Sequence, residues 1–348
     1  MSESARHITL LVPGLCPPGF DVAFLDNPSE RFPALERLLS RSRHERRAAS
    51  GLDASLCSHF DLQCTPAAAL PVAALTCMVD IGEPDAGYLM RADPVHLRAD
   101  QSTLRLFDSR TFSVTQEEAD ALVTAFNELY SDRGWRLVAP DPKRWYLYLP
   151  EVPLVSTVSP GAIAGQTIDP HLPHGRDAAA WHALMNEVQM LFHQHPVNTQ
   201  REASGEPMIN SLWFWGEGRL PDTVRHHRMQ IATDYPLAMG MALFTHTPRT
   251  DLPANLEELL ATAGQSMTLV VLDELEAASQ YADVEAWLKA LKQLERYWFS
   301  PLLSAVEDGR VASLNIDPCS GKNYRTTRRL QKHFWKRVRP LAAVCQHG

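Results

Sequence analysis

The residues best suited to chemistry lie close together, in residues 91–98. Arg91 and Arg98 flank Asp93 and His96, so two guanidinium groups, a carboxylate and an imidazole occur within one short segment. Such a group can transfer protons or hold a ligand. Asp93 and His96 are therefore the catalytic candidates of this chain. The same four residues would equally suit a hydrogen-bonded hinge between two domains.

A second charged segment lies near the C-terminal end. Residues 322–339 are rich in Lys and Arg, contain no Asp or Glu, and include the aromatic residues Phe334 and Trp335. A basic segment with interleaved aromatics can bind nucleic acid or another anionic partner. An apolar stripe at helical spacing favours instead a terminal helix that docks on the protein through this stripe and leaves a solvated basic face. The stripe consists of Leu330, Phe334, Val338 and Leu341. The residues that would contact a partner are Arg325, Arg328, Arg329, Lys332 and Lys336.

Three apolar segments predict buried strands that would position polar groups at one edge of a sheet. They are residues 8–12, 268–272 and 311–316, and Asp273 and Asp317 follow the last two directly. Between these two strands, apolar residues recur at helical spacing. A strand, a helix and a further strand in this order predict a parallel βαβ unit.

The middle of the chain has a different pattern. Thr115 and Glu118 form a capping box that begins a helix, residues 145–149 predict an aromatic strand, and residues 177–193 predict a second helix. This pattern predicts an inserted α+β domain within a parallel-sheet core. We expect the core at residues 1–85, the insertion at residues 86–205, and the second part of the core, with a basic C-terminal helix, at residues 206–348.

Bulk properties set the class of protein. The chain has 348 residues, of which 45% are hydrophobic, which is enough for two cores of ordinary size. A net charge of -8 gives no global attraction to nucleic acid or to an anionic membrane. The polar start and the brief apolar residues 8–12 predict neither a signal peptide nor a membrane span, and so predict a cytoplasmic protein. Six irregularly spaced cysteines favour reduced, structural thiols.

One motif places the chain more closely. His195-Pro196-Val197-Asn198 is followed by Arg201 and then by residues 209–218, INSLWFWGEG, which predict a buried strand whose Gly-x-Gly passes close to another part of the backbone. This combination resembles the cofactor-independent phosphoglycerate mutases of the alkaline phosphatase superfamily, particularly the archaeal type. The similarity covers about residues 68–320. Residues 92–98 and 186–191 are closer still to a bacterial subgroup of regulatory proteins of the RpfE type.

The resemblance implies an alkaline-phosphatase-like α/β fold with a parallel-sheet core flanked by helices and an inserted α+β domain. It also implies two divalent metals held by Asp and His, and a Ser or Thr nucleophile. Several of these groups are missing from the matching positions. The residues found instead are Pro13 for an aspartate ligand, Leu70 for the nucleophilic serine, Glu276 and Gln280 for an Asp and His pair, and Pro318 for a further histidine. The metal-dependent chemistry is therefore expected to be lost.

Other family positions are retained, mostly in the predicted insertion. Arginine is the natural partner of phosphate and carboxylate groups, because its guanidinium binds them through two hydrogen bonds. The retained residues could instead make structural ion pairs or cap a helix. The ligand-binding candidates are Arg91, Arg98, Arg144, His195, Asn198 and Arg201.

The sequence thus favours a catalytically degenerate phosphoglycerate mutase-like protein with a regulatory or metabolite-sensing role and no cofactor. Its expected partner is a small phosphorylated or carboxylated metabolite, with a protein as a further candidate; nucleic acid and membrane are disfavoured. The main alternative is an active mutase or metal-dependent phosphohydrolase whose Mn or Zn would be held by Asp273, Glu276, Asp317 and His246. A second alternative is a nucleic-acid or protein adaptor that uses the basic C-terminal helix.

Overall fold

The computed structural model divides the chain into two compact units. Unit 1 comprises Met1–Gln63 and Val224–Gly348, and unit 2 comprises Cys64–Thr223. Unit 2 extends beyond the insertion that was expected at residues 86–205, because helix α3 (Val72–Asp80) packs on strands β3 (Tyr88–Asp100) and β9 (Ser211–Gly218). The described residues are 6–16, 30–46, 51–62, 70–82, 88–100, 103–218, 220, 228–262, 264 and 266–346.

Unit 1 is built on a seven-stranded sheet in the order β11-β10-β12-β1-β13-β14-β2. The first five strands of this order run parallel, and β14 and β2 join antiparallel at one edge. The predicted strands therefore exist, and β1 lies between β12 and β13. The strands are β1 (His7–Leu11), β2 (Arg43–Arg46), β10 (Gln230–Ala232), β11 (Arg249–Thr250), β12 (Met267–Val271), β13 (Ser313–Asp317) and β14 (Lys322–Thr327).

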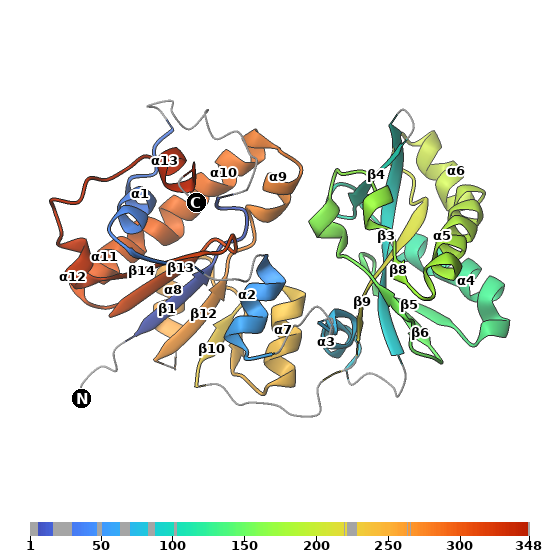
Figure 1. Ribbon diagram of the computed structural model, residues 1–348, viewed down its shortest axis with the longest axis horizontal. Helices are drawn as coiled ribbons and strands as arrows, with labels where there is room; N and C mark the ends of the chain where they lie inside the picture. The colour runs from blue at the N-terminus through green and yellow to red at the C-terminus, as the bar shows by residue number, and fades with distance from the viewer. Residues whose placement is uncertain are drawn as a thin grey trace. The chain divides into compact units, whose positions relative to one another are not determined.

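Both faces of this sheet are buried, as is usual for parallel strands. Leu10 and Val270 belong to the large core cluster, while their neighbours Leu11 and Leu269 are buried on the opposite face. Helices α1, α10 and α11 pack over one face, and α2 and α7 lie over the other (Figure 1). The helices are α1 (Pro33–Ser40), α2 (Leu52–His59), α7 (Pro236–Phe244), α8 (Leu256–Thr262), α9 (Glu276–Gln280), α10 (Val284–Leu294), a π-helical turn (Glu295–Phe299), α11 (Ser300–Asp308), α12 (Arg328–Gln331) and α13 (Leu341–Gln346).

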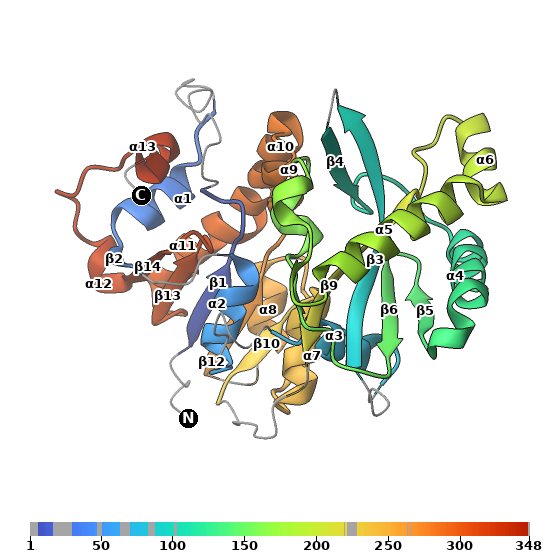
Figure 2. The same ribbon diagram turned by 45° about the vertical axis from the view of Figure 1, so that its right-hand side comes forward.

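Unit 2 is an antiparallel sheet in which β3 is central and pairs with β4, β6 and β9. Alternation along the strands gives it two packed faces. Trp145 lies in the core shared with α4 and α5, whereas the adjacent Tyr146 packs with Ala73 and Cys77 of α3. Helix α3 lies beside β9 and β3 in Figure 2. The remaining elements are β4 (Thr103–Asp108), α4 (Gln116–Tyr130), a 3-10 turn (Ser131–Arg133), β5 (Arg136–Asp141), β6 (Arg144–Leu149), β7 (Val155–Ser156), 3-10 turns (Pro160–Ile163 and Asp169–His171), β8 (His174–Gly175), α5 (Ala178–His193) and α6 (Pro196–Ala203).

Several local predictions for unit 2 are confirmed. Thr115 accepts a hydrogen bond from the Glu118 amide, and the Glu118 carboxylate accepts one from the Thr115 amide, which completes the capping box. Gly216 and Gly218 both have positive φ, at 68° and 145°. A Cβ atom on Gly218 would lie 3.0 Å from Pro71, so only glycine lets this strand pass so close to the start of α3.

The prediction of a basic C-terminal helix is wrong. Residues 328–331 form the single short helix α12, residues 332–340 are not helical, and α13 begins only after Pro340. Proline disfavours helical conformation in the preceding residue, which explains the break before α13. Phe334, which was expected to dock on the protein, is 81% exposed. In the described part of the chain, no helix is long and apolar enough to cross a bilayer.

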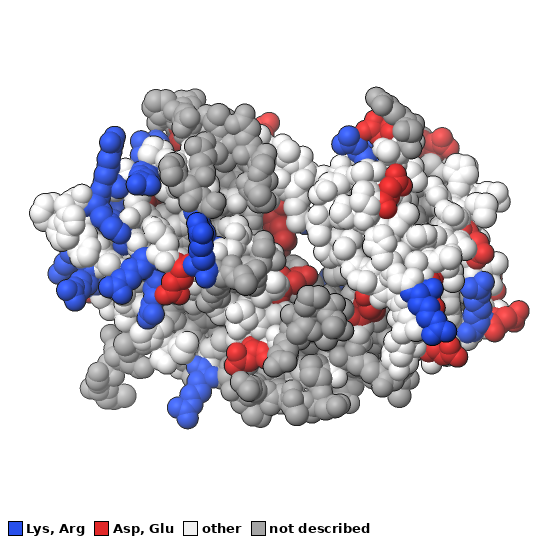
Figure 3. Space-filling model, viewed as in Figure 1, with Lys and Arg blue, Asp and Glu red and all other residues white. Residues whose placement is uncertain are grey.

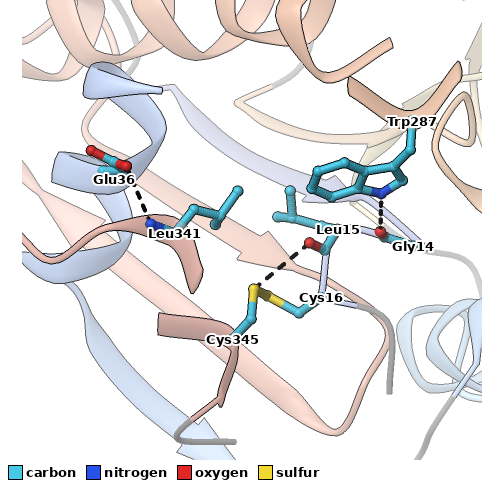
Figure 4. Close-up of a disulfide and its surroundings, with 7 residues drawn as sticks. All are labelled: Gly14, Leu15, Cys16, Glu36, Trp287, Leu341 and Cys345. Atoms are coloured by element: carbon cyan, nitrogen blue, oxygen red, sulfur yellow. Dashed lines mark hydrogen bonds between the residues drawn. A yellow bond between two sulfur atoms is a disulfide. The ribbon is translucent and has the colours of Figure 1, made fainter. Parts of the chain in front are cut away.

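The prediction of reduced cysteines is also wrong. Cys16, in the loop after β1, forms a disulfide with Cys345 of α13 (Figure 4). Cys57 is disulfide-bonded as well, while Cys77 and Cys319 are free and buried. The spacing of the cysteines could not predict the Cys16–Cys345 pair, because these residues are separated by 329 positions and meet only in the folded protein.

Candidate functional site

The carboxyl edge of the parallel sheet is the first candidate site, because polar groups from several loops meet there. Asp317, at the end of β13, is 2% exposed, and its Oδ1 accepts a hydrogen bond from the Cys319 amide at 2.8 Å. The Gly51 amide before α2 donates to the Cys319 carbonyl at 2.7 Å. The loop after β13 is thereby fixed by its own backbone and by the start of α2.

Asp53 and Tyr235 form a second contact at this edge. The Tyr235 hydroxyl donates to Asp53 Oδ1 at 3.2 Å. Burial raises the pKa of Asp53, and burial together with the charges of Asp53, Glu276 and Asp273 raises the pKa of Tyr235. These carboxylates therefore act on a common buried region, and the tyrosine is kept as a neutral donor.

Cys319 is the sulfur group of this edge. Burial, followed by the charge of Asp317, raises the pKa of its thiol. A thiol in such surroundings stays protonated and is a poor nucleophile. The side chain therefore belongs to the packing of the loop.

The residues at this edge do not fit the two metals that the family resemblance implies. The resemblance implies metals held by Asp and His together, and imidazole or thiolate is the usual zinc ligand besides carboxylate. The edge offers Asp53, Asp273, Glu276 and Asp317, and one oxygen of Asp317 already accepts a backbone amide. Among the described residues, no group of three or more His, Cys, Asp and Glu side chains is placed to hold a metal.

His246 does not join this group. It follows α7, which connects the parallel strands β10 and β11, and it precedes β11. Such a helix begins at the carboxyl edge of the sheet and ends at the amino edge. His246 therefore lies at the sheet edge opposite Asp273 and Asp317. The prediction that His246 shares a metal with these carboxylates is wrong.

A charged cluster in unit 2 is the second candidate site. Arg91 Nη2 donates to Asp93 Oδ1 at 2.6 Å, and Trp215 Nε1 donates to Asp93 Oδ2 at 2.7 Å. The Arg91 guanidinium lies 5.4 Å from the ring centres of both Tyr146 and Trp215. Burial raises the pKa of Asp93, while Arg91 and Trp215 act in the opposite direction. Arg91 is thus enclosed by aromatic rings and neutralised within the chain.

Arg144 continues this cluster toward solvent. Arg144 Nη2 and Nε donate to Asp80 at 2.7 and 2.8 Å, and the Tyr146 hydroxyl donates to the same carboxylate at 2.5 Å. Burial alone would raise the pKa of Asp80, but the hydrogen bonds from Arg144 and Tyr146 outweigh it, and the pKa is lowered. The Arg144 side chain is 26% exposed, against 6% for Arg91 and 6% for Asp80. An anion from solvent would therefore meet Arg144 first.

The structure gives the other predicted members of this site different partners. Arg91 and Asp93 bind each other, whereas His96 and Arg98 contact other groups. His96 Nδ1 lies 2.9 Å from the Met208 carbonyl, and burial lowers its pKa. The Arg98 guanidinium lies 4.5 Å from the ring centre of Phe107. The expected compact acid, imidazole and guanidinium group is therefore not formed.

The HPVN motif is used in packing. His195 is the N-cap of α6, and burial lowers its pKa. Asn198 donates to the carbonyls of Phe192 and Ile209, both at 2.8 Å. Arg201, with a side chain 4% exposed, binds Glu118 at 2.8 Å and two backbone carbonyls. These contacts match the structural interpretation considered for the motif.

Sequence reasoning missed Asp80, Tyr146, Asp53 and Tyr235. Asp80 ends α3 and meets Arg144 across 64 positions, and Asp53 meets Tyr235 across 182. No local motif marks these residues.

Comparison with known proteins relates part of the chain to one family. The model for 2,3-bisphosphoglycerate-independent phosphoglycerate mutase matches residues 71–198. The probable enzyme of that name from Geobacter sulfurreducens is 28% identical over 167 residues, which are 45% of this chain and 39% of that protein. The enzyme from Methanosarcina mazei is 24% identical over 166 residues, 43% of this chain and 42% of that protein.

The matched part thus spans about two fifths of the length of these curated relatives. Among solved structures, the PH0037 protein from Pyrococcus horikoshii is similar with a TM-score of 0.51 at 15% identity, covering 92% of this chain and 86% of that one. At this identity the likeness concerns the fold. Residues 71–198 lie within unit 2, and over that region the chain is similar to the cofactor-independent phosphoglycerate mutases.

Proposed function

We propose that this protein is a catalytically degenerate phosphoglycerate mutase-like protein of the alkaline phosphatase superfamily, with the regulatory role of the RpfE-type subgroup. Its ligand would be a small phosphorylated or carboxylated metabolite, bound at Arg144 with Arg91 behind it. The similarity at residues 71–198 supports this assignment, because that region holds both arginines. The donor set at the sheet edge of unit 1, which lacks imidazole among its described members, supports the loss of metal chemistry.

The observation that carries the ligand proposal is the partial exposure of Arg144 within an otherwise buried, charge-balanced cluster. An incoming phosphate or carboxylate would compete with Asp80 for the guanidinium. Removing the charge of Asp80 should therefore strengthen anion binding, and removing Arg144 should abolish it.

The test combines elemental analysis, a mutase assay and calorimetry on the purified protein. We expect no stoichiometric Mn or Zn and no turnover of 3-phosphoglycerate with added Mn²⁺. Titration with 3-phosphoglycerate and with inorganic phosphate should show binding that Arg144→Ala removes and Asp80→Asn increases. Arg110→Ala is the matched control, because Arg110 is similarly exposed and binds Asp108 in the same unit.

An active mutase with a rearranged site is the second candidate. The four carboxylates that share the sheet edge of unit 1 favour it. Turnover with near-stoichiometric metal would establish this candidate and reject the degenerate one. Absence of any binding of either anion would reject the metabolite-sensing role.

A further inference from the structure

The sheet edge of unit 1 formed by β14 and β2 carries like charges set directly against each other. In the antiparallel register, Lys322 faces Arg46 and Arg325 faces Arg43. Like charges directly opposite in a sheet are destabilising. Both pairs are nevertheless present on adjacent strands, and all four residues of β2 are exposed. An anion beside the two strands would relieve this repulsion.

Further cations surround the same edge. His44 lies on the same face of β2 as Arg46 and contacts Tyr324 edge-on, with ring centres 4.9 Å apart. Burial lowers the pKa of His44, and the charges of Lys336, Lys322 and Arg339 lower it further. Lys336 and Arg339 therefore come close enough to act on the edge strand, although they belong to the segment after α12.

The segment after α12 is held in place at several points. Lys336 Nζ donates to the Ser42 carbonyl at 3.3 Å, and the Arg339 amide donates to Ser40 Oγ at 2.9 Å. Arg41 donates to the Gln331 carbonyl at 2.7 Å, and the disulfide of Cys345 fixes the end of the chain. We call β2, β14, α12 and residues 332–339 together the basic edge. Figure 3 shows Lys and Arg side chains gathered on one side of unit 1.

Two aromatic rings are exposed within this basic edge. Phe334 is 81% exposed and Trp335 is 67% exposed. His333 stacks on Trp335 with ring centres 4.5 Å apart and planes at 24°, and Phe334 meets Trp335 edge-on at 5.3 Å. The rings are therefore oriented by one another and remain open to solvent. Exposed aromatic rings beside a basic strip are the elements with which proteins stack unpaired bases and hold the phosphate backbone.

We propose that the basic edge binds single-stranded nucleic acid, with its cations on the phosphates and Trp335 and Phe334 stacked on bases. A flat anionic bilayer would face the whole side of a protein whose net charge is -8, whereas a flexible single strand touches the basic strip alone. In the part of the chain that the structure describes, no carboxylate pairs with Arg328, Arg329 or Lys332, so these side chains are open to phosphate. This site is independent of the metabolite site proposed for unit 2.

The experiment measures fluorescence anisotropy of labelled U12 RNA and dT12 DNA with the full chain at several salt concentrations. We expect binding that weakens linearly on a log-log plot against salt. Arg329→Glu should weaken binding about tenfold or more, and Trp335→Ala about fivefold. Lys289→Glu on α10 is the matched control, because it makes the same charge change at an exposed position of unit 1 outside the basic edge.

Three results would overturn the proposal. Equal binding of heparin with no effect of Trp335→Ala would show attraction to charge alone. Binding to phosphatidylserine vesicles without binding to either oligonucleotide would assign the surface to membrane. Failure of both oligonucleotides to bind at low salt would reject the site, while 3-phosphoglycerate binding in unit 2 would be unaffected. Preference for U12 or dT12 identifies the natural strand, and either preference supports the proposal.

Discussion

The buried arginines of unit 2 and the arginines of the basic edge have opposite surroundings. In unit 2, Arg91, Arg144 and Arg201 each bind a carboxylate at 2.6 to 2.8 Å, and their side chains are 4% to 26% exposed. At the basic edge of unit 1, Arg43 faces Arg325 across two strands. Arginines that are neutralised inside a unit hold the fold together, whereas arginines placed against one another at the surface can attract an external anion. Arg144 is intermediate, because it is paired but partly open.

The largest expected difference concerns Arg201 and Arg329. Arg201→Ala removes a buried cation and leaves Glu118 and two backbone carbonyls without their donor, so it should lower the free energy of unfolding by about 3 kcal/mol. Arg329→Ala alters an exposed residue and should change the free energy of unfolding by no more than about 0.5 kcal/mol. Urea denaturation measures both values. Similar losses for the two variants would contradict the comparison between the units.

The disulfide should stabilise unit 1 by a comparable or slightly smaller amount. Cys16→Ser and Cys345→Ser should each lower the free energy of unfolding by about 2–4 kcal/mol, because each removes a cross-link between distant parts of the chain. The free energy of unfolding of the double variant should be no lower than that of either single variant, since all three variants lack the same disulfide bond. Additive losses of unfolding free energy would mean that each cysteine contributes through its own packing, and that the disulfide bond does not stabilise the protein.

The sequence predicted those parts of the fold that depend on neighbouring residues. The apolar run that forms β1, the capping box of α4 and the Gly-x-Gly of β9 are all local patterns, and each has the expected structure. The predicted parallel sheet followed from the order of the strands.

Partners that are distant in sequence could not be predicted. Asp80 meets Arg144, Asp53 meets Tyr235 and Cys16 meets Cys345 only because the fold brings them together. The apolar stripe that includes Phe334 predicted a helix docked on the protein. This prediction failed because the spacing of apolar residues does not show whether the fold offers a surface on which they can pack. In the structure, hydrogen bonds from Lys336 and Arg339 to the end of α1 and the residues after it hold this segment in a non-helical form.

The ion pair of Asp80 and Arg144 in unit 2 should make the stability of the protein depend on pH. The pKa of Asp80 is lowered in the folded protein, so its stabilising effect is complete above the unfolded value of about 3.9 and is lost as pH falls through the folded value. Asp80→Asn should cost about 1.5–3 kcal/mol at pH 7 and should flatten the loss of stability on acidification. Asp141→Asn removes a more exposed carboxylate from the same arginine and should cost less than about 1 kcal/mol. Equal acid sensitivity in wild type and Asp80→Asn would refute the role of this pair.

The smallest expected effect concerns His44 in unit 1. Burial and, after it, neighbouring cations keep the pKa of His44 low in the free protein, so the folded state loses stability as pH falls from the unfolded value of about 6.5 through the folded value. A bound polyanion would neutralise those cations and favour the charged imidazole. Affinity for U12 should therefore rise about two- to threefold between pH 7.5 and pH 5.5, which is the effect of one exposed charge pair. His44→Gln should abolish this rise. A rise that persists in His44→Gln would contradict the assignment of this pH dependence to His44.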